Sequence, residues 1–157
     1  VVGPTASVAI NNISSVIESS VITTPEDEIR KSHAKAIDDF FAKRNAPLEG
    51  YGMKLVLEAE KNDLPWNLLA AISIIESSGG IQACKKARNS VFGYGSCKMD
   101  FKSIDESIEI VSRRLGGDSK YYHSEMTVPQ ILKKYNSVIP NYTYKVTTVM
   151  SMIEDMK

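Results

Sequence analysis

One acidic residue of the sequence occupies a position from which a carboxyl group could act on a substrate. Leu68, Ile72 and Ile75 recur at i, i+4 and i+7, which places them on one apolar face of a helix. Glu76 follows at i+8 on that face, and the helix stops at residues 77–80, where glycine is free to take the left-handed cap. The spacing therefore predicts a carboxyl group at the C-terminal end of a buried helix.

This position favours the protonated form of the Glu76 carboxyl. Partial burial disfavours the charged form, and the negative end of the helix dipole disfavours it again. A glutamic acid that keeps its proton near neutral pH is what a general acid requires. The alternative interpretation is that Glu76 only caps the helix or pairs with a lysine, since most glutamates at helix ends are not catalytic.

The elements that must position Glu76 are all predicted to be helical. They are defined by apolar residues at helical spacing and by stops at glycine or proline. Two of them also begin with a capping box, at Ser103/Glu106 and at Thr127/Gln130. Asp63 is the expected cap of the Glu76 helix, and Pro65 is expected in its first turn. The expected helices are residues 25–44, 52–62, 63–77, 104–115, 128–134 and 141–156. No strand is convincing, and residues 92–97 form a small hairpin at most, so the predicted fold class is all-α.

Composition limits the classes of function. The chain has 157 residues, with 19 Lys and Arg balanced by 19 Asp and Glu, which argues against a binder of duplex nucleic acid. No apolar run approaches the ~20 residues of a membrane span. Nothing in the sequence calls for a metal or an organic cofactor. We interpret residues 1–25 as an N-terminal tail or linker and residues 26–157 as one domain, expected to act as a monomer.

Two cysteines, Cys84 and Cys97, lie thirteen positions apart in a loop rich in Gly, Asn and Ser. A disulfide between them would close a 14-residue loop and stabilise the fold by roughly 3 kcal/mol on the chain-entropy account. Such a bridge would place the protein outside the cytosol, secreted or in the cell envelope. The alternative is a pair of unlinked thiols in a reducing compartment.

The loop that contains these cysteines, residues 79–101, is long for a compact domain, and loops of that length usually carry a function. Gly93 could allow close approach of the backbone to a ligand. Phe92 and Tyr94 could stack on a sugar or fill the core, and core packing is the commoner use of aromatic residues.

Three blocks of sequence resemble the lysozyme superfamily, in particular bacterial lytic transglycosylases and N-acetylglucosaminidases that cut peptidoglycan. The first is the apolar helix ending in Glu76-Ser77, and the second is the Asn-Ser-Val-Phe-Gly-Tyr-Gly run of residues 89–95. The third is Tyr135-Asn136 followed by Tyr142. The similarity covers about residues 37–156.

This resemblance implies a single lysozyme-like helical domain with a central, disulfide-closed active-site loop. It implies that Glu76 protonates a β-1,4 glycosidic oxygen between N-acetylmuramic acid and N-acetylglucosamine, and that the acetamido group of the substrate assists. The partner is then a peptidoglycan strand. The substrate-binding residues that the resemblance implies are Ser77, Asn89, Phe92, Gly93, Tyr94, Tyr135, Asn136 and Tyr142.

Two alternatives stay open at this point. Most glycosidases use two carboxylates, and the downstream candidates are Asp100, Asp105 and Glu106, of which the last two are explained by helix capping. Without a second acid, a non-catalytic module that binds glycan strands or a partner protein is the main alternative. An enzyme that acts on chitin-like polymers is the other.

Overall fold

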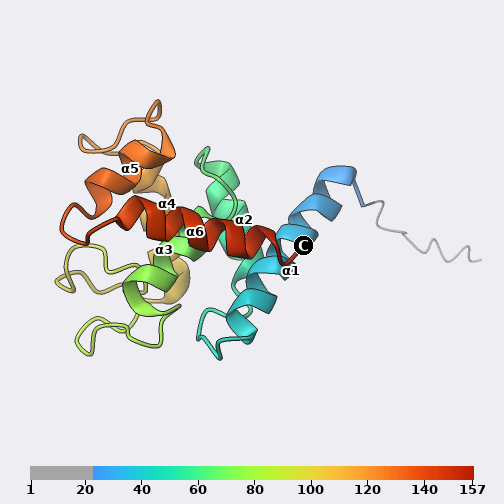
Figure 1. Ribbon diagram of the computed structural model, residues 1–157, viewed down its shortest axis with the longest axis horizontal. Helices are drawn as coiled ribbons and strands as arrows, with labels where there is room; N and C mark the ends of the chain where they lie inside the picture. Colours follow the sequence, from blue (N-terminus) through green and yellow to red (C-terminus); the bar gives the residue numbers. More distant parts are fainter. Residues whose placement is uncertain (1–22) are drawn as a thin grey trace, which may run out of the picture.

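Six α-helices and no strand make up the part of the chain that the computed structural model describes, residues 23–157 (Figure 1). This confirms the all-α prediction. The helices are α1 (Pro25–Ala42), α2 (Gly52–Lys61), α3 (Leu68–Ser77), α4 (Ile104–Leu115), α5 (Val128–Tyr135) and α6 (Tyr142–Glu154). The predicted tail, residues 1–25, lies outside the described residues up to position 22, and α1 begins at Pro25.

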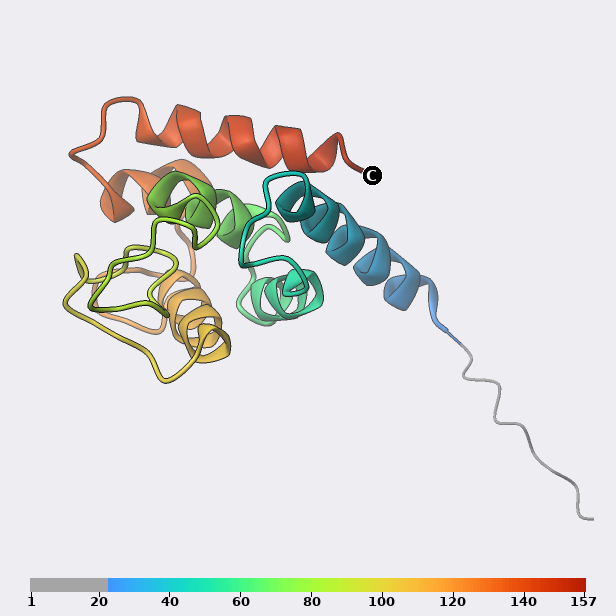
Figure 2. The ribbon, with the colours of Figure 1, turned by 90° about the horizontal axis from the view of Figure 1, so that it is seen from below.

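Helix α3 lies in the interior of this arrangement. Every residue from Leu68 to Ser73 is buried, so its apolar surface extends around the helix rather than along one face. A helix that is apolar all round is stable only when other elements surround it. Helix α6 packs along α3, and α2 also contacts it (Figure 2). The last turn of α3, with Glu76, is therefore held against a rigid neighbour.

The N-terminus of α1 is fixed by a threonine cap. The Thr24 hydroxyl accepts a hydrogen bond from the Asp27 N–H at 3.1 Å, and the Asp27 carboxylate accepts one from the Thr24 N–H at 3.1 Å. This reciprocal pair satisfies two backbone donors that have no partner inside the helix. Helix α1 then packs on α2, which in turn packs on α4.

The predicted start of α3 was wrong. The helix begins at Leu68 with Asn67 as the preceding residue, rather than at Asp63 and Pro65. Asp63 instead takes a left-handed conformation (φ 54°) just after α2, where its N–H bonds back to Glu60 O. The Asn67 side chain donates to the carbonyl of Met150 on α6 at 3.0 Å. A contact distant in sequence therefore determines where α3 starts.

Two smaller local predictions were also wrong. Ser78, not a glycine, takes the left-handed position directly after α3 (φ 54°), with Gly79 and Gly80 following at positive φ. At α4 only half of the capping box forms. Ser103 accepts from the Glu106 N–H, while the Glu106 carboxylate accepts from the N–H of Lys102 rather than that of Ser103. No hairpin strand occurs in residues 92–97.

The two long connections, residues 78–103 and 116–127, gather at the same end of the helical arrangement (Figures 1 and 2). The C-terminal ends of α3 and α5 point toward this end as well. Within residues 23–157, none of the helices combines the length and apolar character needed to cross a bilayer.

The packing of α1 on α2 makes a stability prediction at Gly52. A Cβ at this position would collide with the Ala34 carbonyl oxygen and lie 2.8 Å from Oδ1 of Asp38. Helix propensity alone would favour alanine by about 1 kcal/mol. We expect Gly52→Ala instead to lower the free energy of unfolding by about 1–3 kcal/mol, as overpacking does, in urea denaturation. Leu57→Met, a change of similar volume at an exposed position of α2, should change it by less than about 0.5 kcal/mol. A Gly52→Ala protein as stable as wild type would contradict this packing.

Candidate active site

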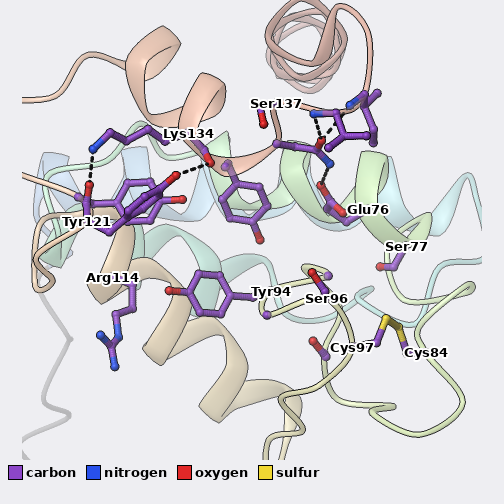
Figure 3. Close-up of a pocket in the computed structure, with 18 of the residues that line it drawn as sticks. Glu76, Ser77, Cys84, Tyr94, Ser96, Cys97, Arg114, Tyr121, Lys134 and Ser137 are labelled. Atoms are coloured by element: carbon purple, nitrogen blue, oxygen red, sulfur yellow. Dashed lines mark hydrogen bonds between the residues drawn. A yellow bond between two sulfur atoms is a disulfide. The ribbon is translucent and has the colours of Figure 1, made fainter.

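A cleft of about 890 Å³ opens where the loops gather (Figure 3). Its lining comes from the end of α3, the loop of residues 79–101 that contains both cysteines (the cysteine loop), the end of α4 with the connection that follows, and the end of α5. The lining residues used below are Glu76, Ser77, Cys84, Gly93, Tyr94, Cys97, Arg114, Lys120, Tyr121, Lys134, Tyr135 and Asn136. The volume lies within the range of pockets that hold drug-sized molecules, roughly 300–1,000 Å³.

Glu76 is partly exposed in this cleft, and two donors hold one of its oxygens. The Tyr142 hydroxyl donates to Oε1 at 2.7 Å, and Nδ2 of Asn136 donates to the same oxygen at 3.4 Å. Tyr142 is the first residue of α6 and is almost fully buried. Because both hydrogen bonds end on Oε1, Oε2 is the oxygen left available for proton exchange.

Gly93 lies directly beside Oε2. Its backbone is left-handed (φ 61°), and a Cβ at this position would lie 2.6 Å from Oε2 of Glu76. Any larger residue would displace the carboxyl group. The sequence suggested that Gly93 allows the backbone to approach a ligand closely. In the structure the group that it approaches is the Glu76 carboxyl.

Asn136 is oriented by its own backbone. Its Oδ1 accepts hydrogen bonds from the N–H groups of Val138 at 3.1 Å and Ile139 at 2.9 Å. An asparagine side chain that accepts from the following residues forms a tight local turn. With Oδ1 engaged on that side, Nδ2 points toward Glu76.

Tyrosines make up the wall beside the carboxyl group. Tyr135 stacks on Tyr142 with ring centroids 6.1 Å apart and planes 8° from parallel, and Tyr94 lies 6.2 Å from Tyr135 at a tilt. The Tyr135 hydroxyl donates to the carbonyl of Phe92 at 2.6 Å, which ties α5 to the cysteine loop. Burial, and secondly the hydrogen bond with Glu76, raise the pKa of Tyr142 well above its usual value, so this hydroxyl remains a donor.

Three of the predicted substrate-binding residues hold the loop in place. Ser77 touches the cleft but is only 2% exposed, and its hydroxyl contacts Val91 O at 2.5 Å and accepts from the Gly80 N–H. Asn89 donates to the Phe101 carbonyl at 2.7 Å and is not among the residues that line the cleft. Phe92 is fully buried in the core. Tyr142 is not among the residues that line the cleft either, and its hydroxyl contacts Glu76.

Cys84 and Cys97 form the predicted disulfide, with their Cα atoms 5.9 Å apart. Both residues border the cleft. The bridge joins the two ends of the segment that carries Gly93 and Tyr94. It therefore limits how far this wall can move from Glu76.

Basic residues also line the cleft, and none of them was predicted as a site residue from the sequence. Arg114, Lys120 and Lys134 line it, whereas Glu76 is the only carboxylate among the described lining residues. Asp100, Asp105 and Glu106 are not in the lining. Arg114 and Lys134 lie in the last turns of amphipathic helices, where cations are common because they suit the helix dipole, so no sequence signal marks them as functional.

Two further observations concern the class of site. Among residues 23–157 no group of three or more His, Cys, Asp or Glu side chains could hold a metal ion. No protein-family model, no curated protein and no solved structure matches this chain. The function must therefore be argued from the geometry of the cleft.

Three tyrosines, of which Tyr122 and Tyr142 are buried and Tyr135 is half-buried, lead us to expect a loss of stability at high pH. Burial is the main cause that raises the pKa of Tyr122, Tyr135 and Tyr142. Each stays protonated in the folded protein while an unfolded tyrosine loses its proton near pH 10. The folded state then binds more protons, so the free energy of unfolding falls as pH rises above 10. Each tyrosine contributes about 1.4 kcal/mol to this fall between pH 9 and 11.

Urea denaturation at several pH values measures this effect. We expect Tyr142→Phe to make the decline between pH 9 and 11 shallower by about 1.4 kcal/mol. Leu57→Ala, which alters no titratable group, should keep the wild-type slope. An unchanged slope in Tyr142→Phe would mean that this phenol ionises in the folded protein.

Proposed function

We propose that this protein is a lysozyme-like enzyme that cleaves β-1,4 bonds between N-acetylmuramic acid and N-acetylglucosamine in peptidoglycan. The observation that carries the proposal is the way the Glu76 carboxyl group is held in the cleft. One carboxyl oxygen is held by Tyr142 and Asn136, and the carboxyl group lies in a cleft large enough for a sugar chain. A fixed carboxyl group with one free oxygen suits proton transfer to a bound substrate.

In the first step Glu76 acts as the general acid. With Oε1 accepting from Tyr142 and Asn136, Oε2 is the oxygen that passes a proton to the glycosidic oxygen as the C1–O bond breaks. The electron pair of that bond leaves with the departing sugar. The same Oε1 hydrogen bonds then stabilise the carboxylate that remains.

The second step needs no second protein carboxylate. Since Glu76 is the only acid among the described lining residues, the carbonyl oxygen of the substrate's 2-acetamido group is the nucleophile that we propose for C1. The Glu76 carboxylate then takes a proton from the hydroxyl that opens this intermediate. A water molecule gives hydrolysis, whereas the O6 hydroxyl of the same sugar gives an anhydro product.

The remaining predicted residues receive specific positions in this proposal. Tyr94 and Tyr135 offer aromatic surface to sugar rings next to Glu76. Gly93, which has no side chain, leaves room for the Glu76 carboxyl group beside these rings. Ser77, Asn89 and Phe92 support the wall from behind. The disulfide supports an extracytoplasmic location, secreted or in the cell envelope, and we propose that the protein acts there as a monomer.

A glycan-binding module without catalysis is the second candidate function. The observation that favours it is the single carboxylate in the cleft, because most glycosidases position two. Binding to insoluble peptidoglycan without release of soluble fragments would support this module over the enzyme.

The enzymatic proposal predicts a specific effect of Glu76→Gln. Loss of the proposed general acid should lower the release of soluble fragments from cell-wall sacculi by about 10²–10⁴-fold. The thermal melt should stay close to that of wild type, because glutamine keeps the side chain's shape and its hydrogen bond with Tyr142. Glu49→Gln is the matched control, since Glu49 is exposed and outside the cleft. Wild-type clearance by Glu76→Gln would refute the enzyme.

Mass spectrometry of the products completes this experiment. Reducing ends indicate hydrolysis, and a mass lower by one water indicates the anhydro ring. Digestion of chitin oligomers in parallel separates peptidoglycan cleavage from an activity on chitin-like polymers.

The contact between Gly93 and Glu76 gives a further prediction. Gly93→Ala should lower the turnover rate by about 100-fold, because displacing a catalytic group by about 1 Å costs that much. Gly95→Ala is the control. It also introduces a side chain at positive φ (72°) in the same loop, but its nearest neighbour is Met99 rather than Glu76. Equal losses in the two variants would assign the effect to loop strain instead of the carboxyl group.

A further inference from the structure

The charge of the cleft is one-sided. Arg114, Lys120 and Lys134 line it, and Glu76 is the single carboxylate among the described lining residues. Figure 3 shows Arg114, Tyr121 and Lys134 toward one end of the cleft and Glu76 toward the other. We call Arg114 and Lys134 the basic end. The general acid of the proposed mechanism does not require these cations.

Arg114 is not neutralised within the described part of the chain. It is half-buried in the last turn of α4, and no carboxylate there forms an ion pair with it. Its neighbour Arg113, by contrast, pairs with Asp118 at 2.9 Å. An arginine that borders a cleft without a carboxylate partner keeps its planar set of donors available for a ligand.

Lys134 is positioned without being neutralised. Its ammonium group donates to the Tyr121 carbonyl at 2.6 Å and lies 4.6 Å from the centroid of the Tyr121 ring. The Tyr121 hydroxyl lies 3.3 Å from the Lys134 carbonyl oxygen. These contacts hold the end of α5 and the connection after α4 together. They restrain the ammonium group and leave its charge at the cleft, since a carbonyl and a ring face carry no net charge.

We propose that the basic end binds a carboxylate carried by the substrate at a distance from the bond that is cut. This inference rests on the proposed function and specifies the substrate further. In peptidoglycan such carboxylates belong to the stem peptides, or to the lactyl group where the peptide has been removed. Chitin offers none. A concave site lined with one sign of charge concentrates ligands of the opposite sign, and arginine binds carboxylates through paired hydrogen bonds.

The test measures binding in the Glu76→Gln background, where turnover does not interfere. The probes are a peptidoglycan tetrasaccharide with stem peptides, the same tetrasaccharide after amidase treatment, which leaves the lactyl carboxylates, and neutral chitotetraose. Arg114→Gln/Lys134→Gln should weaken binding of the peptide-bearing probe at least 10-fold in calorimetry. Binding of chitotetraose should change less than 2-fold. Arg88→Gln/Lys145→Gln is the matched control, because both residues are exposed, outside the cleft and carry the same two charges.

The outcomes separate the sources of the charge. A 10-fold loss with the peptide-bearing probe alone assigns the basic end to stem-peptide carboxylates. A loss with the amidase-treated probe alone assigns it to the lactyl carboxylate, and a loss with both probes shows that the basic end accepts either carboxylate. Equal effects on all three probes, or no effect on any, would overturn the inference. Affinity for the peptide-bearing probe should also fall with added salt in the Glu76→Gln background, which tests the charge without altering Arg114 or Lys134.

The inference and the proposed function fail in different ways. Charge-dependent binding by a wild-type protein that releases no fragments keeps the basic end and removes the enzyme. Fragment release with affinities that do not depend on Arg114 and Lys134 keeps the enzyme and removes the basic end.

Discussion

The hydrogen bond from Tyr142 to Glu76 links two helix ends that are 66 residues apart in the sequence. It exists because α6 packs along the buried helix α3, so that the first residue of α6 meets the last turn of α3. At this end of α3 the helix dipole opposes a negative charge. A hydroxyl donor at 2.7 Å compensates for that, and the cleft depends on the resulting fixed position of the carboxyl group.

The cysteine loop forms another wall of the cleft, and a disulfide and several hydrogen bonds hold it in place. The cysteine loop contains turns but no helix or strand. The Cys84–Cys97 bridge, the Ser77 contact with Val91 and the hydrogen bond from Tyr135 to Phe92 join it to itself, to α3 and to α5. A loop without its own hydrophobic core can therefore keep Gly93 against the carboxyl group. Loops positioned by a rigid scaffold commonly carry the functional residues of a protein.

Much of the fold followed from local patterns in the sequence. The all-α class, the extent of α2 and the end of α4 at Gly116 were predicted correctly, because each depends on neighbours within one or two helical turns. The start of α3 was not. The Asn67 side chain donates to the Met150 carbonyl on α6, and Asp63 lies in the turn that ends α2. The long-range contact therefore outweighs the local preference of Asp63 and Pro65 for the start of a helix.

For the candidate site, too, some features follow from the sequence and others only from the tertiary structure. By itself the sequence determined that Glu76 ends an apolar helix, that a glycine-containing loop follows it, and that two cysteines could close that loop, since these are matters of residue type and spacing. Only the tertiary structure decided that Tyr142 and Asn136 hold one oxygen of Glu76, that Asn89 and Phe92 support the loop rather than line the cleft, and that Arg114 and Lys134 border it. The physical reason is that α3, α4, α5 and α6 meet at one end of the molecule only through the burial of their apolar faces. Local sequence patterns report which face of a helix is apolar but not which other helix will cover it.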